Sequence, residues 1–258
     1  MANPALSNNP AFRSNAPVSA ATLEELYERP AATPAETGRM TYEDTAVKTV
    51  ILFAVLLATG AVGWLFPPLA FVGAIGGFVL ALVNTFKREP SVPLIVAYAA
   101  LEGLFVGGIT AIFELAYPGV AVQAVLATLV TVGVTLALFA SGRIRASARA
   151  TKIFLIAIVA YLVFRLVELA ILAFGGSSSP FGLSSDVKIA GIPLGVLIGL
   201  LAVLLAAYSL VLDFDQIQQG VRRGLPAKYG WTGAFGLMVT IVWLYVEFLR
   251  IFAILNRR

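Results

Sequence analysis

Seven long apolar runs constrain the fold of this chain more than any other feature. A transmembrane helix needs about 20 mostly apolar residues to cross the hydrocarbon core of a bilayer, and each run has close to that length. The runs are continuous and lack an alternation of period two, which excludes a transmembrane β-barrel. The chain is therefore predicted to be an all-α integral membrane protein. The predicted spans are residues 46–66, 68–86, 93–115, 120–140, 151–174, 190–217 and 231–255.

The composition agrees with this class. Hydrophobic residues make up 59% of the chain and charged residues 12%, whereas a soluble domain has roughly 25% charged residues. Small residues recur at four-residue spacing within the spans, a pattern that lets helix backbones approach closely in lipid. Packing between helices is the simplest interpretation of these pairs, which are Gly73 with Gly77, Gly103 with Gly107, and Gly195 with Gly199.

The amino-terminal residues differ from the rest of the chain. Residues 1–40 are rich in Asn, Pro, Ala and Ser and contain no apolar run, so they are not a secretory signal peptide. We interpret them as a disordered cytoplasmic arm, and a regulatory arm that binds a partner is the alternative. Residues 41–258 form the predicted seven-helix domain, which begins with a hydroxyl cap at Thr41 followed by Glu43 and Asp44.

Basic residues in the short loops predict the orientation. Nine Lys and Arg residues lie near the loops after spans two, four and six, whereas Lys188 is the one basic residue in the loops after spans one, three and five. The amino terminus is therefore predicted to be cytoplasmic and the carboxyl terminus to lie outside, in a plasma membrane. The net charge of +4 follows from this topology, and we expect no nucleic-acid partner.

The residue types that are missing exclude several kinds of site. The chain has no Cys and no His, so it lacks disulfides, thiolate metal sites and the usual general base and pH switch. A rhomboid-type serine protease needs a His. The paired motifs of intramembrane aspartyl proteases, the lysine of retinal proteins and a phosphate-binding glycine loop are also missing. We therefore predict no enzyme activity and no cofactor, and any titration near neutral pH falls to carboxylates.

Ionisable residues inside the spans are the best candidates for function, because they are expensive in lipid. Arg165 with Glu168 and Glu247 with Arg250 are each three residues apart and can form ion pairs on one helix face. Glu114 lies near the outer end of its span, where it can reach headgroups. Glu102 has no local partner and must be neutral, paired across helices or facing water.

Two acids lie near the cytoplasmic end of span six. Asp213 and Asp215 are two residues apart and therefore point about 200° from each other around a helix. One of them can face the bundle while the other faces the interface. Asp215 is interpreted as a residue that reaches the interface or caps a helix, and Asp213 is the deeper of the two.

Several segments resemble a known family. Leu212-Asp-Phe-Asp-Gln-Ile217 is similar to the Asp-x-x-Gln-Ile motif of the Bax inhibitor family, also called the YccA-like or transmembrane Bax inhibitor motif proteins. Leu244-Tyr-Val-Glu-Phe248 resembles that family's Leu-Tyr-x-Asp-Phe motif. The run from Gly107 to Glu114, together with Val122-Gln-Ala124 and Thr128, resembles its third and fourth spans. The resemblance covers about residues 42–256 in order.

The resemblance implies a bundle in which the last helix is central, and a pH-sensitive leak for calcium or another cation. In that family two acids on spans six and seven share a proton and engage a basic residue. Asp213 and Glu247 match the two acids, with calcium as a possible ligand, and Lys87 or Arg88 matches the base. Asp215, Glu102 and Glu114 are further candidates for the ion pathway.

The spacing leaves the meeting of the two acids open. Asp213 lies about four residues from the end of span six, and Glu247 lies some 16 residues into span seven, a difference in depth of roughly 15 Å if both helices begin at the surface. The acids meet if span seven starts inside the cytoplasm or if span six continues past Gln219. The alternative function is a non-conducting regulator, because the family includes a member that restrains a membrane-bound quality-control protease.

Overall fold

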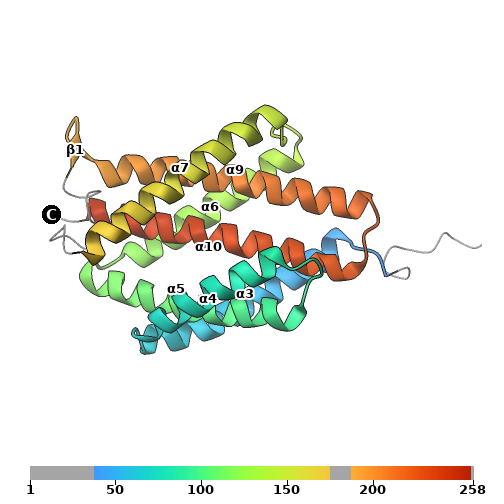
Figure 1. Cartoon of the computed structure of the whole chain (residues 1–258), viewed down its shortest axis with the longest axis horizontal. Helices are drawn as coiled ribbons and strands as arrows, with labels where there is room; N and C mark the ends of the chain where they lie inside the picture. The colour runs from blue at the N-terminus through green and yellow to red at the C-terminus, as the bar shows by residue number, and fades with distance from the viewer. Residues whose placement is uncertain (1–37, 175–186, 257–258) are drawn as a thin grey trace, which may run out of the picture. The chain divides into compact units, whose positions relative to one another are not determined.

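The computed structural model describes residues 38–174 and 187–256, so the predicted disorder of residues 1–37 lies outside the described residues. The described parts contain seven helices that are long and apolar enough to cross a membrane, which confirms the predicted fold class (Figure 1). These helices are α3 (Tyr42–Leu65), α4 (Leu69–Phe86), α5 (Val92–Ala116), α6 (Val120–Ala140), α7 (Ala148–Ala173), α9 (Leu194–Arg222) and α10 (Gly230–Leu255).

Span six is shifted from its predicted bounds at both ends. A short antiparallel hairpin of β1 (Lys188–Ile189) and β2 (Ile192–Pro193) precedes α9, and Ala190 and Gly191 form its turn with φ angles of 51° and 83°. The helix therefore begins at Leu194 instead of residue 190. At its other end α9 continues to Arg222, and the short 3₁₀ helix η2 (Ala227–Tyr229) leads into α10.

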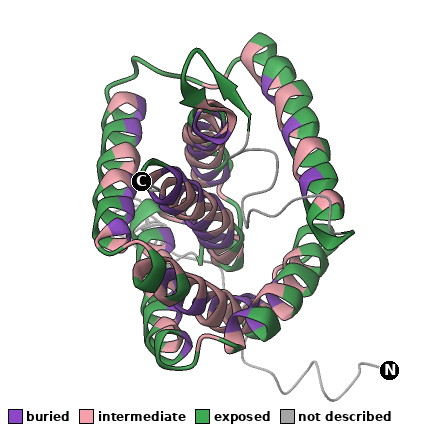
Figure 2. Ribbon diagram, turned by 90° about the vertical axis from the view of Figure 1, so that its left-hand side faces the viewer, coloured by how far each residue is buried: buried purple, intermediate pink, exposed green. Residues whose placement is uncertain are grey.

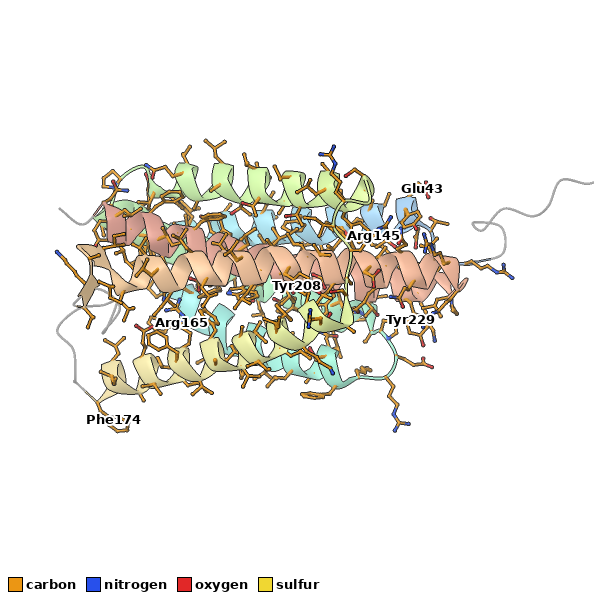
Figure 3. All side chains as sticks on the ribbon, turned by 90° about the horizontal axis from the view of Figure 1, so that it is seen from above. Glu43, Arg145, Arg165, Phe174, Tyr208 and Tyr229 are labelled. Carbon is orange, nitrogen blue, oxygen red and sulfur yellow. The ribbon has the colours of Figure 1, made fainter. Side chains whose placement is uncertain are left out.

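Consecutive helices run in opposite directions, so alternate loops lie at the same end of the bundle. We call the end with the α4–α5, α6–α7 and α9–α10 loops the basic end. Figure 3 shows Glu43, Arg145 and Tyr229 toward this end and Phe174 at the other, with Arg165 between them. The basic end carries the nine Lys and Arg residues Lys87, Arg88, Arg143, Arg145, Arg149, Lys152, Arg222, Arg223 and Lys228.

The last helix, α10, is central. Half of the residues in its membrane-spanning stretch are buried, the largest share among the described helices. It contacts α3, α5, α6 and α9. Figure 2 shows this helix enclosed by the others, with buried residues on several of its faces. Residues buried along α10 include Ala234, Met238, Leu244 and Leu249. The prediction that the last helix is central is confirmed.

Glycines bring α3, α4 and α5 together. A Cβ atom on Gly107 would overlap the backbone carbonyl oxygen of Gly60 on α3, and one on Gly73 would lie 2.5 Å from the Leu101 carbonyl oxygen on α5. These helices therefore meet backbone to backbone, the close approach that small residues allow in lipid. The packing interpretation of the spaced glycines is supported.

Helix α7 is the least buried of the described membrane helices, since 11% of its membrane-spanning stretch is buried in the protein. It contacts α9 through Phe154 and Tyr208, whose ring centroids are 5.5 Å apart. It contacts α10 through Tyr161 and Trp243, whose ring centroids are 5.8 Å apart. Much of its apolar surface is exposed and available to lipid.

The boundary of the bundle lies earlier than predicted. The Thr41 hydroxyl accepts the backbone N–H of Asp44 at 3.0 Å, which confirms the predicted helix start. Residues 38–40 were expected in the arm, but Met40 is buried and its N–H donates to the Leu225 carbonyl oxygen at 2.7 Å. These three residues therefore belong to the helical unit, which begins at Gly38.

Candidate functional site: two acidic centres along the central helices

Asp213 lies on α9 and faces α10. Its Oδ2 atom accepts a hydrogen bond of 2.7 Å from the Thr240 hydroxyl, and the Ser209 hydroxyl lies 3.3 Å from that of Thr240. Gly236 leaves room for the carboxylate, since a Cβ there would lie 3.3 Å from Asp213 Oδ1. Within the described residues, no Lys or Arg forms a salt bridge with Asp213, and its side-chain partner is the Thr240 hydroxyl.

A pocket of about 150 Å³ reaches Asp213 from the basic end. Glycines on both helices make space for it, and polar side chains alternate with apolar ones along its wall. This pocket gives Asp213 room for a few waters or a hydrated cation. It is lined by Met40, Asp213, Gln216, Ile217, Gly220, Leu225, Tyr229, Thr232, Gly233 and Gly236.

A second acidic centre lies between α7 and α10, farther from the basic end. We call Arg165, Glu168, Glu247 and Arg250 the charge cluster. Arg165 binds Glu168 at 2.9 Å and Glu247 at 2.7 Å, while Arg250 lies 3.5 Å from Glu247 and 3.8 Å from Glu168. Both predicted intrahelical pairs are present, and the two cross-helix contacts join them into one network.

Tyr161 completes the charge cluster. Its hydroxyl donates to Glu247 Oε1 and accepts from Arg165 Nε at 2.9 Å. Glu247 is 3% exposed, and its Oε2 atom has an ionic contact with Arg250 but no hydrogen bond within the described residues. A buried charge needs this many partners because its transfer out of water is costly.

A cavity of about 430 Å³ adjoins the charge cluster. Three cluster residues, Arg165, Glu168 and Arg250, form its polar wall, and the rest of the lining is apolar or aromatic and comes from α5 and α7. The remaining lining residues are Ile109, Ile112, Phe113, Ala116, Tyr117, Leu169 and Leu172.

The structure does not bring Asp213 and Glu247 together. Asp213 bonds to Thr240, which precedes Glu247 by seven residues, or about 10 Å along the helix axis. Glu247 instead lies near Gly199, far from Asp213 along α9. Although α9 does continue past Gln219, the register of the hairpin still separates the acids. The contact between two carboxyl groups that a shared proton requires is therefore not present in this structure.

An apolar layer separates the two centres. It consists of Ala206 and Leu210 on α9 and Leu244 on α10, which form one cluster and are each fully buried. These residues lie between the level of Thr240 and that of Glu247 along α10. Within the described part of the chain, no three or more His, Cys, Asp or Glu residues gather in a group that could hold a metal ion.

Three further candidates lie near the basic end. Lys87 and Arg88 follow α4, are exposed, and form no salt bridge with any described residue, so the structure does not place either as a partner of Asp213 or Glu247. Asp215 accepts a hydrogen bond of 2.6 Å from Gln219 one turn later on α9. It does not line the pocket, which agrees with the interpretation of Asp215 as an interfacial residue.

The two acids on α5 have separate surroundings. Glu102 lies beside the Tyr98 hydroxyl in a cavity of about 230 Å³ next to Gly77 on α4. Tyr98 precedes Glu102 by one turn of the same helix, so the prediction that Glu102 has no local partner is wrong. Glu114 accepts the backbone N–H groups of Gly119 at 2.7 Å and Ala121 at 3.0 Å. It therefore caps the first turn of α6, whereas the sequence suggested a contact with headgroups.

Two residues of these centres were missed from the sequence. Tyr161 precedes Arg165 by four residues, so its place on the same helix face was available as a signal. Thr240 carried no comparable signal, because hydroxyl side chains in membrane helices often bond to their own backbone. Its role depends on the register between α9 and α10.

Comparison with known proteins assigns the family. No curated protein matches the chain. A family model described as Bax inhibitor 1 like matches residues 3–257, which extends the similarity beyond the segments that carry the sequence motifs. With nearly the whole length matched, the chain belongs to the Bax inhibitor 1 like family of membrane proteins.

Proposed function

We propose that this protein is a regulated, pH-sensitive leak for calcium or another cation across a plasma membrane, with its basic end in the cytoplasm. The supporting observation is that Asp213 and the charge cluster lie at different depths, each beside a cavity, and are separated by the apolar layer of Ala206, Leu210 and Leu244. This arrangement is typical of a pathway in its closed state.

Asp213 is the residue proposed to receive the cation. Carboxylate oxygens are preferred ligands of calcium, and within the described residues no basic side chain competes for this one. A hydroxyl partner at Thr240 can reorient when a cation arrives, whereas an arginine would have to be displaced. The same carboxylate can take a proton, which removes the negative charge and gives the leak its dependence on pH.

The charge cluster has a different part in this proposal. Its two arginines and two glutamates sum to zero charge, so it presents polar groups beside the larger cavity without holding a cation tightly. Passage requires Leu210 and Leu244 to separate, because a cation in an apolar constriction loses its water without gaining ligands.

The test is calcium flux into liposomes that contain the purified protein and an enclosed indicator, measured at pH 6 and pH 8. The wild type should conduct at rates that differ between the two pH values. Asp213→Asn should lower the flux by about tenfold, which corresponds to about 1.4 kcal/mol of lost cation stabilisation, and should flatten the dependence on pH.

Asp215→Asn is the matched control, because it removes a carboxylate two residues away that bonds locally to Gln219 and does not line the pocket. It should retain the wild-type flux and pH response. Equal effects of the two substitutions would contradict a specific role for Asp213. A wild type that passes no cation at either pH would favour the alternative function, a non-conducting regulator that binds a membrane-bound protease.

A further inference from the structure

We propose that residues 38–40 form a strap that closes the Asp213 pocket at the basic end, and that displacement of the strap opens it. The consequence for ion flux rests on the proposed function, whereas the closure itself follows from contacts made by three residues. In the sequence, the strap directly follows residues 1–37.

The backbone of the strap pairs with the loop between α9 and α10. The Met40 N–H donates to the Leu225 carbonyl oxygen at 2.7 Å, and the Ala227 N–H donates to the Gly38 carbonyl oxygen at 2.8 Å. Arg39 and Pro226 form an antiparallel bridge between these bonds. Two hydrogen bonds are a modest attachment, so the strap can be released without unfolding a helix.

The Met40 side chain fills the mouth of the pocket. It is 3% exposed and lines the same pocket as Asp213. Its sulfur packs so closely on Gly220 that a Cβ added there would lie 2.9 Å away. Methionine is flexible and fits irregular spaces, which suits a side chain that must both seal a pocket and leave it.

The opposite side of the loop is held firmly by α3. Lys48 is buried, and its Nζ atom donates to the Ala227 carbonyl oxygen at 2.6 Å and to the Asp44 carboxylate at 2.5 Å. The ammonium group also lies 5.7 Å from the ring centroid of Trp231. With the loop fixed in this way, the strap is the part of the mouth that is able to move.

Gly38 supplies the hinge. Its φ angle of 64° lies in the left-handed region, which glycine adopts at low cost. Gly38 directly follows residues 1–37, so a partner that binds this segment and pulls on it would act on the strap through one glycine. Binding of a partner to residues 1–37 would then regulate access to Asp213 through the strap.

Accessibility of the pocket provides a direct test, and the chain has no native Cys to interfere. Asp213→Cys would report the depth of the pocket in detergent-solubilised protein treated with a charged methanethiosulfonate reagent. Adding Met40→Gly should raise the labelling rate by at least about tenfold, whereas Met40→Leu, which keeps the volume, should leave it low. Asp215→Cys, outside the pocket, should label at one rate in all three backgrounds.

A disulfide clamp tests the effect on flux. Arg39 and Pro226 oppose each other between two flanking hydrogen bonds and therefore form a non-hydrogen-bonded pair. In such pairs the two Cα atoms are about 4.5 Å apart, a distance that a disulfide can span. The double variant Arg39→Cys with Pro226→Cys should lose calcium flux on oxidation and regain it on reduction.

The two measurements separate the two proposals. If Asp213→Cys is labelled at the same rate alone, with Met40→Gly and with Met40→Leu, the proposal that the strap closes the pocket is wrong. Labelling that responds to position 40, combined with flux that ignores the clamp, would support the strap and contradict a leak through the Asp213 pocket.

Discussion

The charge cluster and the Asp213 pocket place acids against the same central helix but balance them in different ways. Glu247 has two arginines and a tyrosine hydroxyl around it, whereas Asp213 has one threonine hydroxyl and an adjoining cavity. The contacts of Glu247 with arginines and a tyrosine from α7 and α10 join these two helices. Asp213 lacks such charged partners within the described residues, which is why we propose this carboxylate, and not Glu247, for the exchange of protons or cations.

The largest expected effect comes from breaking the charge cluster. Arg165→Met should lower the free energy of unfolding by about 3–5 kcal/mol, because it leaves Arg250 as the one basic side chain that pairs with the buried Glu247 and Glu168 within the described residues. Thermal or denaturant unfolding in detergent would measure the loss. The cost lies in the unpaired charge, so adding Glu247→Gln to Arg165→Met should recover part of it. A double variant with the summed losses of its parents would show that the pair is not coupled.

A smaller effect is expected at Asp213. Thr240→Val keeps the shape of the side chain but removes the hydroxyl that donates to Asp213, and should lower the free energy of unfolding by about 1 kcal/mol. Thr131→Val is the control, because the Thr131 hydroxyl bonds within its own helix, to the Ala127 carbonyl oxygen. Unfolding measured in the same detergent should separate the two variants. A Thr240→Val loss as large as that of Arg165→Met would mean that Asp213 is held as rigidly as the charge cluster.

The smallest effect is expected for an ion pair in water at the basic end. Glu89 binds Lys228 at 2.9 Å, and both side chains are exposed. The hydrogen bond from Lys228 and its positive charge lower the pKa of Glu89 below its ordinary value of 4.5. A lowered pKa in the folded state gives stability that is present above the ordinary value of 4.5 and is lost as the pH falls from there through the lowered pKa.

Solvent screens such a pair, so Glu89→Gln should leave the melting temperature at pH 7 unchanged within error. Any small difference between the variant and the wild type should be present at pH 7 and should disappear at low pH. Melting curves at several pH values would measure this. A clear loss at pH 7 would show that the α4–α5 loop anchors η2 more strongly than an exposed ion pair allows.

The sequence was sufficient to predict the number, order and approximate bounds of the helices, because apolar runs of about 20 residues have few other solutions. It also predicted the pairs Arg165–Glu168 and Glu247–Arg250, since residues three apart on a helix are neighbours whatever lies around them.

The contacts between helices could not be predicted in the same way. The partner of Asp213 depends on the residue at which α9 ends and the residue at which α10 begins. A shift of either bound by a few residues would change which side chains of α9 and α10 face each other. A continuation of α9 to Arg222 and a start of α10 at Gly230 place Thr240 opposite Asp213. The burial of Met40 could not be predicted from the sequence either, because its partners Leu225 and Gly220 are distant along the chain.

The shallow burial of α7 has a consequence for how the protein assembles. Lipid tails are as apolar as leucine, so the aliphatic side chains of this helix gain little by leaving lipid for protein. The rotation of α7 about its own axis must then be determined by polar contacts, chiefly those of Tyr161 and Arg165 with Glu247. Helix α7 is thus expected to insert as an independent segment and to dock onto an already formed core. Its ion pairs and hydrogen bonds, and not its apolar contacts, would then determine how it docks.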